Sequence, residues 1–446
     1  LHLGRRLLAL LWAGRAGIDS KKFQGGMGKM MLVLGIIIII GTIYLLLKRY
    51  DSRLILLASG VLMATLAGKP MEAFVAFSKS MTEGGLIQAI CSVMGFALVM
   101  KVTGCDAHLI KLVAKALSKV RPLLIPGATI ATFAINIALP SAAGVAAAVG
   151  AIFIPLLMSA GIHPATAAAA VKSGTYGSML SPGLAHNAFV AKLAKMNVMD
   201  VISVHYMADI VSVIIASVAI TGVAFFLKEH KGYVYQNAAA INNEEKANLL
   251  YAIVPLIPVL MLVLGATGKV PAFKMGVPEA MLIGGIIALL VTRKNPVEVT
   301  KSFFDGMGTA YAQIMGIIIA AGVFVSGMKA LGLVDSFIAA MLNAGSFVKM
   351  AAAFGPFILG IISGSGDAAA FAFNEAVTPH AQQFGLEIVN MGSMASLGGA
   401  LGRTMSPITG ATIICAGIAG VNPMEIAKRN ALGMICAMIV AMFILL

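Results

Sequence analysis

The segment GSMLSPG at residues 177–183 recurs as GRTMSPI at residues 402–408, and this pair decides how the chain is interpreted. Both segments place Gly, Ser and Pro at the same spacing, 225 residues apart (402 − 177). Similar offsets relate Pro70, Glu72, Phe77 and Met81 to Pro296, Glu298, Phe303 and Met307, and Ser141, Pro155 and Gly161 to Ser365, Pro379 and Gly385. A nearly constant offset over most of a half-chain indicates an internal duplication, which is typical of many secondary transporters.

The composition places the chain in a membrane. Apolar residues make up 59% of it and charged residues 11%, whereas soluble domains carry about 25% charged residues. The sequence therefore predicts an all-α polytopic membrane protein, because a backbone in contact with lipid must satisfy its own hydrogen bonds. The net charge of +14 comes mostly from loops, so it indicates membrane topology and no nucleic-acid partner.

Apolar runs predict about five transmembrane helices in each half. The predicted crossings are 31–47, 54–66, 85–102, 164–195 and 207–227, then 249–264, 278–291, 311–330, a crossing broken at 406–407, and 431–446. Each half also contains one predicted re-entrant hairpin with limbs of about half a bilayer. The first hairpin covers 123–159 with its tip at 139–143, and the second covers 348–384 with its tip at 363–367. The predicted breaks in the crossings lie at 181–183 and 406–407.

An odd number of crossings per half predicts that the second repeat is inverted relative to the first. The domains are then residues 1–26 as an N-terminal extension, 27–228 as the first inverted repeat, 229–248 as a linker without further function, and 249–446 as the second repeat. The more basic set of loops is expected in the cytoplasm, which places the N-terminus outside. The basic residues of 1–26 contradict this, so either they lie upstream of a start near Met27 or Met30, or the crossing count is off by one.

Two hairpin tips and two helix breaks are expected to meet around a binding site. Half-helix N-termini there favour an anion, whereas half-helix C-termini and unwound carbonyls favour a cation. The hydroxyl groups available at these positions belong to Ser141, Ser181, Ser363, Ser365, Ser406 and Thr409, and Asn187 adds an amide. The alternative is that these Gly, Ser and Pro residues only begin and end helices and form no binding site.

Three charged residues lie near the predicted site. Arg403 is a candidate for binding a substrate carboxylate, and the alternative is that it pairs with a helix C-terminus or with Asp367. Asp367 suits proton coupling if neutral and cation binding if ionised, and the alternative is a cap on the following half-helix. Lys172 lies deep in a broken crossing, and substrate contact is one hypothesis for it. No catalytic constellation, metal-ligand cluster or phosphate loop occurs, so an enzyme is not expected.

The segment Gly364-Ser365-Gly366-Asp367-Ala368, the run from Leu397 to Gly410 and the segment Asn422-Pro423-Met424-Glu425 resemble the anaerobic C4-dicarboxylate carriers of type C. The likeness covers roughly Met30 to the end of the chain. It implies a carrier of succinate, fumarate or malate in the bacterial inner membrane, with no cofactor beyond a sodium ion or proton as coupling ion. It also implies a homodimer of elevator type, with a moving domain that carries the hairpins.

The resemblance implies the residues of the site as well. The substrate-binding residues would be Ser141, Ser181, Asn187, Ser365, Gly366, Ser406, Pro407, Thr409 and Arg403, and the coupling residues Asp367 and Ser363. The first half departs from the family pattern at its tip, at its break and at Lys172. A carrier of another organic anion or of an amino acid therefore remains an alternative, ahead of a membrane enzyme or a channel.

Overall fold

The computed structural model describes residues 20–446 except 49, 121–122, 236–246, 269 and 343–346. The N-terminal extension predicted for residues 1–26 therefore lies largely outside the described residues. Every regular element among the described residues is helical. Six helices are long and apolar enough to cross a membrane, namely Gly84–Thr103, Ala142–Ser159, Val198–Phe226, Leu249–Ala266, Pro296–Ala330 and Pro423–Leu445. A polytopic all-α membrane protein is thereby confirmed.

The described residues form two compact units, and those of 20–80 with 319–340 make the first. Its helices are α2 (Ser20–Leu47), α3 (Ser52–Leu66), α4 (Pro70–Met81), most of α16 (Gly316–Ala330) and α17 (Leu333–Leu342). A hydrogen bond of 2.7 Å from Thr42 Oγ1 to Ser59 Oγ joins α2 to α3. Helix α2 begins at Ser20, earlier than the predicted start at residue 31.

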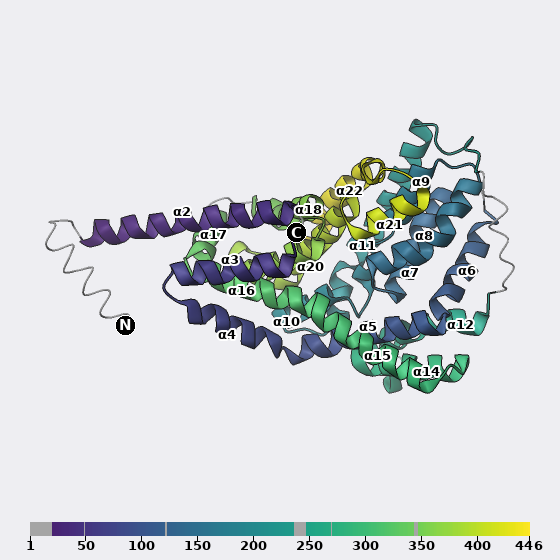
Figure 1. The fold of residues 1–446 in the computed structure, drawn as a ribbon, viewed down its shortest axis with the longest axis horizontal. Helices are drawn as coiled ribbons and strands as arrows, with labels where there is room; N and C mark the ends of the chain where they lie inside the picture. Colours follow the sequence, from purple (N-terminus) through teal and green to yellow (C-terminus); the bar gives the residue numbers. More distant parts are fainter. Residues whose placement is uncertain (1–19, 49, 121–122, 236–246, 269, 343–346) are drawn as a thin grey trace. The chain divides into compact units, whose positions relative to one another are not determined.

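The second unit contains residues 81–318 and 341–446. One part of it comprises α5 (Gly84–Thr103), α6 (Cys105–Leu117), α12 (Leu249–Ile253), α13 (Ile257–Ala266), α14 (Val277–Thr292) and α15 (Pro296–Ala310). Helices α5 and α15 lie side by side (Figure 1). A π-helical segment, η6 (Tyr311–Met315), follows α15 directly, so this long helix begins at Pro296 and not near Tyr311 as predicted.

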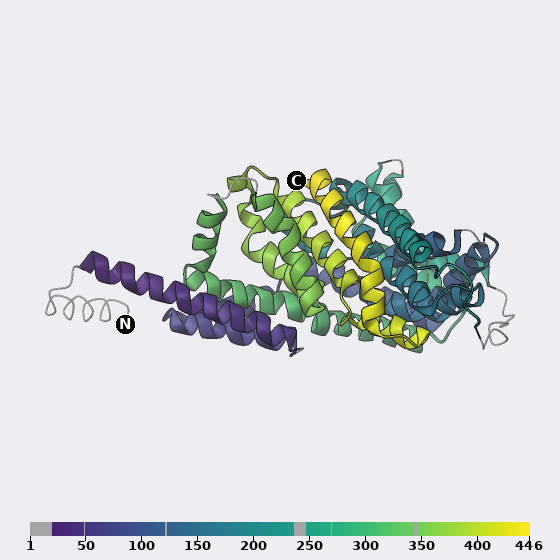
Figure 2. The ribbon, with the colours of Figure 1, turned by 90° about the horizontal axis from the view of Figure 1, so that it is seen from above.

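The other part of this unit contains the predicted hairpins and broken helices. The first set comprises α7 (Leu124–Ala138), α8 (Ala142–Ser159), α9 (Pro164–Ser173), η2 (Gly177–Leu180), α10 (Ala185–Ala194) and α11 (Val198–Phe226). The second set comprises α18 (Phe347–Ser363), α19 (Gly366–Ala376), η7 (Thr378–Phe384), α20 (Ile388–Met405), α21 (Gly410–Ala419) and α22 (Pro423–Leu445). In Figure 2 the yellow α22 lies beside the teal α11, and the two helices share an extensive contact.

The predicted interruptions are confirmed at all four positions. Helix α7 ends and α8 begins around Ser141, and α18 ends and α19 begins around Ser365. The helix breaks lie between α9 and α10 and between α20 and α21. The predicted limb length is wrong for the first hairpin, however. The 18 residues of α8 span about 27 Å at 1.5 Å per residue, far more than half a bilayer.

The start of the predicted linker has a structural role that the sequence did not reveal. Glu229 follows α11 and accepts two hydrogen bonds from Arg429 of α22, at 2.8 Å from Nε and 2.5 Å from Nη2. The hydroxyl of Thr166 at the start of α9 also donates to this carboxylate. Arg429 is 7% exposed, so this bidentate ion pair is buried. Together with Thr166 it links the end of α11 to the N-terminal parts of α9 and α22.

Candidate functional site

A hydrogen-bonded asparagine joins the first hairpin tip to the first helix break. Asn136, near the end of α7, donates from Nδ2 to the carbonyl of Leu139 at 2.9 Å. Its Oδ1 accepts a hydrogen bond of 2.9 Å from the backbone N–H of Ser178 in η2. Ser141 caps α8 by accepting from the N–H of Gly144 at 3.1 Å. Asn136 therefore links the tip to the break, and the three hydrogen bonds satisfy backbone groups that helix ends leave without a partner.

A second buried network lies behind the first break. Asn187 donates from Nδ2 to the carbonyls of Met179 at 2.7 Å and Ser181 at 3.0 Å. Its Oδ1 lies 3.1 Å from Nε2 of His205, whose Nδ1 lies 2.6 Å from Asp209 Oδ2. Both side chains of the His205–Asp209 pair are fully buried. Asn187 and Ser181 therefore hold the break in shape and do not line the cavity described below.

The second tip and the second break are built in the same way. Ser365 caps α19 by accepting from the N–H of Ala368 at 3.3 Å, and Ser363 accepts from the N–H of Ser365 at 3.1 Å. At the break, Thr409 caps α21 by accepting from the N–H of Thr412 at 3.2 Å. The hydroxyl of Thr412 donates to the carbonyl of Ser406 at 2.8 Å.

The tip of the second hairpin packs directly against α20. A Cβ atom on Gly366 would lie 2.1 Å from the carbonyl oxygen of Gly399 and 3.1 Å from Cβ of Arg403. No real side chain tolerates the first of these distances. Gly366 therefore serves the close approach of two backbones, which brings the second tip next to Arg403.

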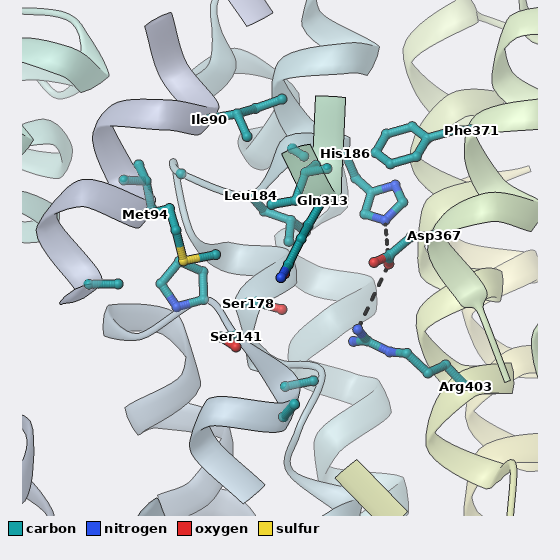
Figure 3. A pocket seen from close by; sticks show the side chains of 18 residues that line it. Ile90, Met94, Ser141, Ser178, Leu184, His186, Gln313, Asp367, Phe371 and Arg403 are labelled. Atoms are coloured by element: carbon teal, nitrogen blue, oxygen red, sulfur yellow. Dashed lines mark hydrogen bonds and ion pairs between the residues drawn. The ribbon is translucent and has the colours of Figure 1, made fainter. Parts of the chain in front are cut away.

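A cavity of about 220 Å³ lies where these elements meet α5 and η6. Its polar side chains come from both tips or breaks and from the π-helical segment: Ser141, Ser178, His186, Gln313, Asp367 and Arg403. Figure 3 shows the Gln313 amide and the Ser141 and Ser178 hydroxyls around the space faced by Asp367 and Arg403. Apolar residues including Ile90, Met94 and Phe371 complete the wall. The volume is below the roughly 300 Å³ of typical drug-sized sites, so it suits a small solute.

Asp367 connects the two halves of this cavity. Its Oδ1 lies 3.1 Å from Nε2 of His186 in α10 and 3.8 Å from Nη1 of Arg403 in α20 (Figure 3). The His186 ring stacks on Phe371, with the ring centroids 4.3 Å apart. Ser365, not Asp367, provides the cap of α19, so the capping alternative for Asp367 is wrong.

Arg403 is also tied to the first half. Its Nη2 donates to the carbonyl of Thr175 at 3.5 Å, and its own carbonyl accepts from Nζ of Lys172 at 3.3 Å. The buried Nε of Arg403 has no hydrogen-bond partner among the residues that the structure describes. The predicted pairing with Asp367 is therefore present, and the side chain still lines the cavity.

The structure thus separates the predicted site residues into two groups. Ser141, Asp367 and Arg403 line the cavity. The others lie behind it or in caps and turns: Ser181, Asn187, Ser363, Ser365, Gly366, Ser406, Pro407 and Thr409. Sequence reasoning missed Asn136, Ser178 and Gln313. Gln313 could have been found as a lone amide in the predicted apolar crossing 311–330. Asn136 could have been found as a lone amide in an apolar limb of the first hairpin.

A metal centre is not evident in the described part of the chain. No group of three or more His, Cys, Asp or Glu side chains there could hold a metal ion. The cavity can instead bind a small anion or zwitterion, because it combines one guanidinium, one carboxylate and several neutral hydrogen-bond donors.

The helices and the cavity define a multi-pass membrane protein with a solute-sized site between two broken helices. A family model described as the C4-dicarboxylate anaerobic carrier, DcuC, matches residues 52–446. The chain belongs to this family, which confirms the resemblance seen in the sequence. Its relatives are named transporters and not enzymes.

Individual relatives agree with this assignment. A Haemophilus influenzae protein named only as an uncharacterised transporter is 46% identical over 279 residues, covering 60% of this chain and 100% of that protein. The anaerobic C4-dicarboxylate transporter DcuC of Escherichia coli K12 is 24% identical over 449 residues, covering 92% of this chain and 95% of that one. The structure of MtrF from Neisseria gonorrhoeae is similar in fold, with a TM-score of 0.63 and 14% identity over 84% of this chain and 83% of that one.

Proposed function

We propose that this chain is a secondary carrier that moves C4-dicarboxylates such as succinate, fumarate and malate across the bacterial inner membrane. Membership of the carrier family supports the substrate class. The observation that carries the proposal is the Arg403 guanidinium on the wall of a small cavity between the two helix breaks. A guanidinium binds a carboxylate through charge-assisted hydrogen bonds, which are the strong ones in proteins.

The cavity offers different partners to the two carboxylates of such a substrate. One carboxylate replaces Asp367 as the partner of Arg403, since their present separation of 3.8 Å is longer than a hydrogen bond. The other faces the neutral donors Ser141, Ser178 and Gln313. Asp367 then moves toward His186, which already lies 3.1 Å away. We keep Asp367 and Ser363 as the proposed coupling residues of this carrier, with a proton or sodium ion as partner.

The proposed architecture is two inverted repeats, residues 27–228 and 249–446, joined by a linker at 229–248. Matching hydrogen bonds support it. Ser141 bonds the N–H of Gly144 as Ser365 bonds that of Ala368, both pairs related by 224 residues (365 − 141 and 368 − 144). Asn187 bonds the carbonyl of Ser181 as Thr412 bonds that of Ser406, both related by 225 (412 − 187 and 406 − 181).

Matching helix contacts support the repeats as well. A Cβ atom on Gly177 would lie 2.0 Å from the carbonyl oxygen of Phe133, and one on Gly402 would lie 2.1 Å from that of Phe357. We further propose that the hairpins and broken helices form the moving part of an elevator, and that two copies assemble as a homodimer.

A second candidate substrate is an amino acid with a side-chain carboxylate. Asp367 is 43% exposed in its side chain and faces the cavity beside Arg403. A neighbouring cation and anion suit a substrate that carries both an ammonium and a carboxylate.

Counterflow in proteoliposomes tests these alternatives. Vesicles loaded with unlabelled succinate should accumulate labelled succinate, and external fumarate or malate should compete with it. Competition by aspartate that exceeds that of succinate would favour the amino-acid carrier. The absence of exchange with every dicarboxylate in the panel would contradict the proposal.

A further inference from the structure

Lys172 is a buried lysine without an anionic partner among the described residues. It lies in the last turn of α9 and is 0% exposed. Its Nζ has two hydrogen-bond partners, Thr175 Oγ1 at 3.4 Å and the carbonyl oxygen of Arg403 at 3.3 Å. No ion pair to a carboxylate is found for it among the described residues.

The helices packed against α9 do not supply the missing negative charge. The titratable side chains near Lys172 are Arg403 of α20 and Cys415 of α21, and a buried free thiol is uncharged. On α11, Asp209 is bonded to His205, and on α22, Glu425 is paired with Lys428 and Arg429. Helices α7 and α8 carry no charged residue. An ammonium at Lys172 therefore meets a neighbouring guanidinium and no free carboxylate.

The same lysine is connected to the substrate cavity through one residue. Lys172 bonds the backbone carbonyl of Arg403, whose guanidinium lines the cavity and bonds the carbonyl of Thr175. Lys172 thus lies where the last turn of α20 meets the first broken helix. Carbonyls at such half-helix C-termini favour a cation.

A carboxylate bound at Arg403 changes the charge balance around Lys172. Burial disfavours a charged amine that has no counter-ion, and a nearby negative charge favours it. Anion binding and protonation of Lys172 therefore favour each other, and this coupling is reciprocal.

We propose that Lys172 is the proton-binding group of this carrier. Its neutral amine takes up one proton from solution when an anionic substrate binds at Arg403, and the ammonium returns that proton when the substrate leaves. The coupling ion is then a proton, and sodium is not required. This inference rests on the proposed function and deepens it: it chooses the proton over sodium as coupling ion, and it assigns that proton to Lys172 in place of Asp367 and Ser363.

Proton uptake on binding tests the proposal directly. The purified protein in weakly buffered detergent solution is titrated with succinate at a pH at which succinate carries no proton, and a pH indicator reports the protons taken up. We expect the wild type to take up about one proton per succinate bound. Lys172→Met should take up none, and Lys172→Arg should bind succinate without proton uptake because arginine stays charged. Lys101→Met, which removes an exposed lysine of α5, is the control and should match the wild type.

The outcomes separate this inference from the function on which it rests. Succinate binding by the wild type without proton uptake would overturn the inference alone. So would a wild type that binds or transports succinate only when sodium replaces choline. Unchanged proton uptake in Lys172→Met, or its loss in His186→Gln instead, would place the proton elsewhere. If Lys172→Met does not fold, Lys172→Arg decides, because it keeps the charge and proton uptake by this variant would overturn the assignment to Lys172. Failure to bind any anion in the panel would contradict the carrier function and this inference with it.

Discussion

The guanidinium of Arg403 lies 3.8 Å from the carboxylate of Asp367, and the two residues face the same cavity from α20 and α19. In this arrangement Asp367 occupies the partner position that a substrate carboxylate would take. The charges of Arg403 and Asp367 therefore largely cancel within the cavity. Arg403 remains able to exchange Asp367 for another carboxylate partner.

Replacement of Arg403 by glutamine should weaken substrate binding. A hydrogen bond to a charged group contributes about 1.5–3 kcal/mol, so we expect the apparent KM for succinate counterflow to rise roughly 10- to 100-fold. Arg403→Lys should be intermediate, because lysine keeps the charge but lacks the forked geometry. Counterflow at wild-type KM in Arg403→Gln would exclude this residue from the site. Thermal unfolding in detergent serves as the control for correct folding.

Removal of the Asp209 carboxyl group should destabilise the protein, whereas its replacement by an amide should not. Asn187 donates both amide hydrogens to carbonyls, so its Oδ1 must accept a hydrogen bond from His205 Nε2. One proton then lies between His205 Nδ1 and the Asp209 carboxyl group. Asp209→Ala leaves a buried imidazole nitrogen unpaired and should destabilise the protein by about 1–3 kcal/mol.

Asp209→Asn provides the matched comparison, because its amide can donate to His205 Nδ1. It should unfold near the wild-type temperature, whereas Asp209→Ala should unfold at a clearly lower one. Equal unfolding temperatures for the two variants would show that the network does not hold the first break.

The Glu229–Arg429 pair should make stability depend on pH. Burial alone would raise the pKa of Glu229, but the hydrogen bonds from Arg429 and Thr166 and the charges of Arg429 and His163 lower it below its usual value. A carboxyl group with a lowered pKa in the folded state contributes stability that is present above its unfolded pKa of about 4.3. That contribution is lost as the pH falls through the lower folded value.

Thermal unfolding between pH 6 and pH 3 measures this effect, with roughly the lower half of that range as the sensitive window. Glu229→Gln should unfold at a lower temperature than the wild type near neutral pH, and the difference should shrink as the pH falls. A difference that stays constant over the range would argue against the ion pair.

Close helix packing at Gly402 should not tolerate a side chain. A Cβ atom there would lie 2.1 Å from the carbonyl oxygen of Phe357, so Gly402→Ala must push α18 away from α20. Overpacking of this kind costs about 1–3 kcal/mol. Gly417→Ala in α21 is the control, because nothing lies within 4 Å of its Cβ position. Alanine is about 1 kcal/mol better than glycine in a helix, so the control should equal or exceed wild-type stability.

The sequence predicted the helix interruptions correctly, but it assigned substrate binding to more of the hydroxyl groups there than line the cavity. Ser365 directly precedes α19, and Thr409 directly precedes α21. The first backbone N–H groups of a helix have no partner within that helix. A serine or threonine at that position satisfies one of these groups itself, and both do so here. Their hydroxyls are thus engaged locally, whereas Ser141, which also caps a helix, lines the cavity as well.

Gln313 shows why part of the site could not be predicted. It lies in a long apolar helix that the duplicated motifs do not single out, and a π-helical segment spans this position. The extra residue in a π-turn changes which side chains share a helix face. Only the packing of that helix against α5 decided that the Gln313 amide faces the cavity that Asp367 and Arg403 also line.

The sequence by itself determined that the chain is helical and lies in a membrane, where its helices are interrupted, and to which family it is similar. These properties follow from apolar run length and from local residues such as the Ser-Pro pairs, which act within a few positions along the chain. The tertiary structure alone decided which polar groups share a cavity and that Lys172 lies against the carbonyl of Arg403. Contacts between residues more than two hundred positions apart depend on how helices pack, and local sequence does not specify that geometry.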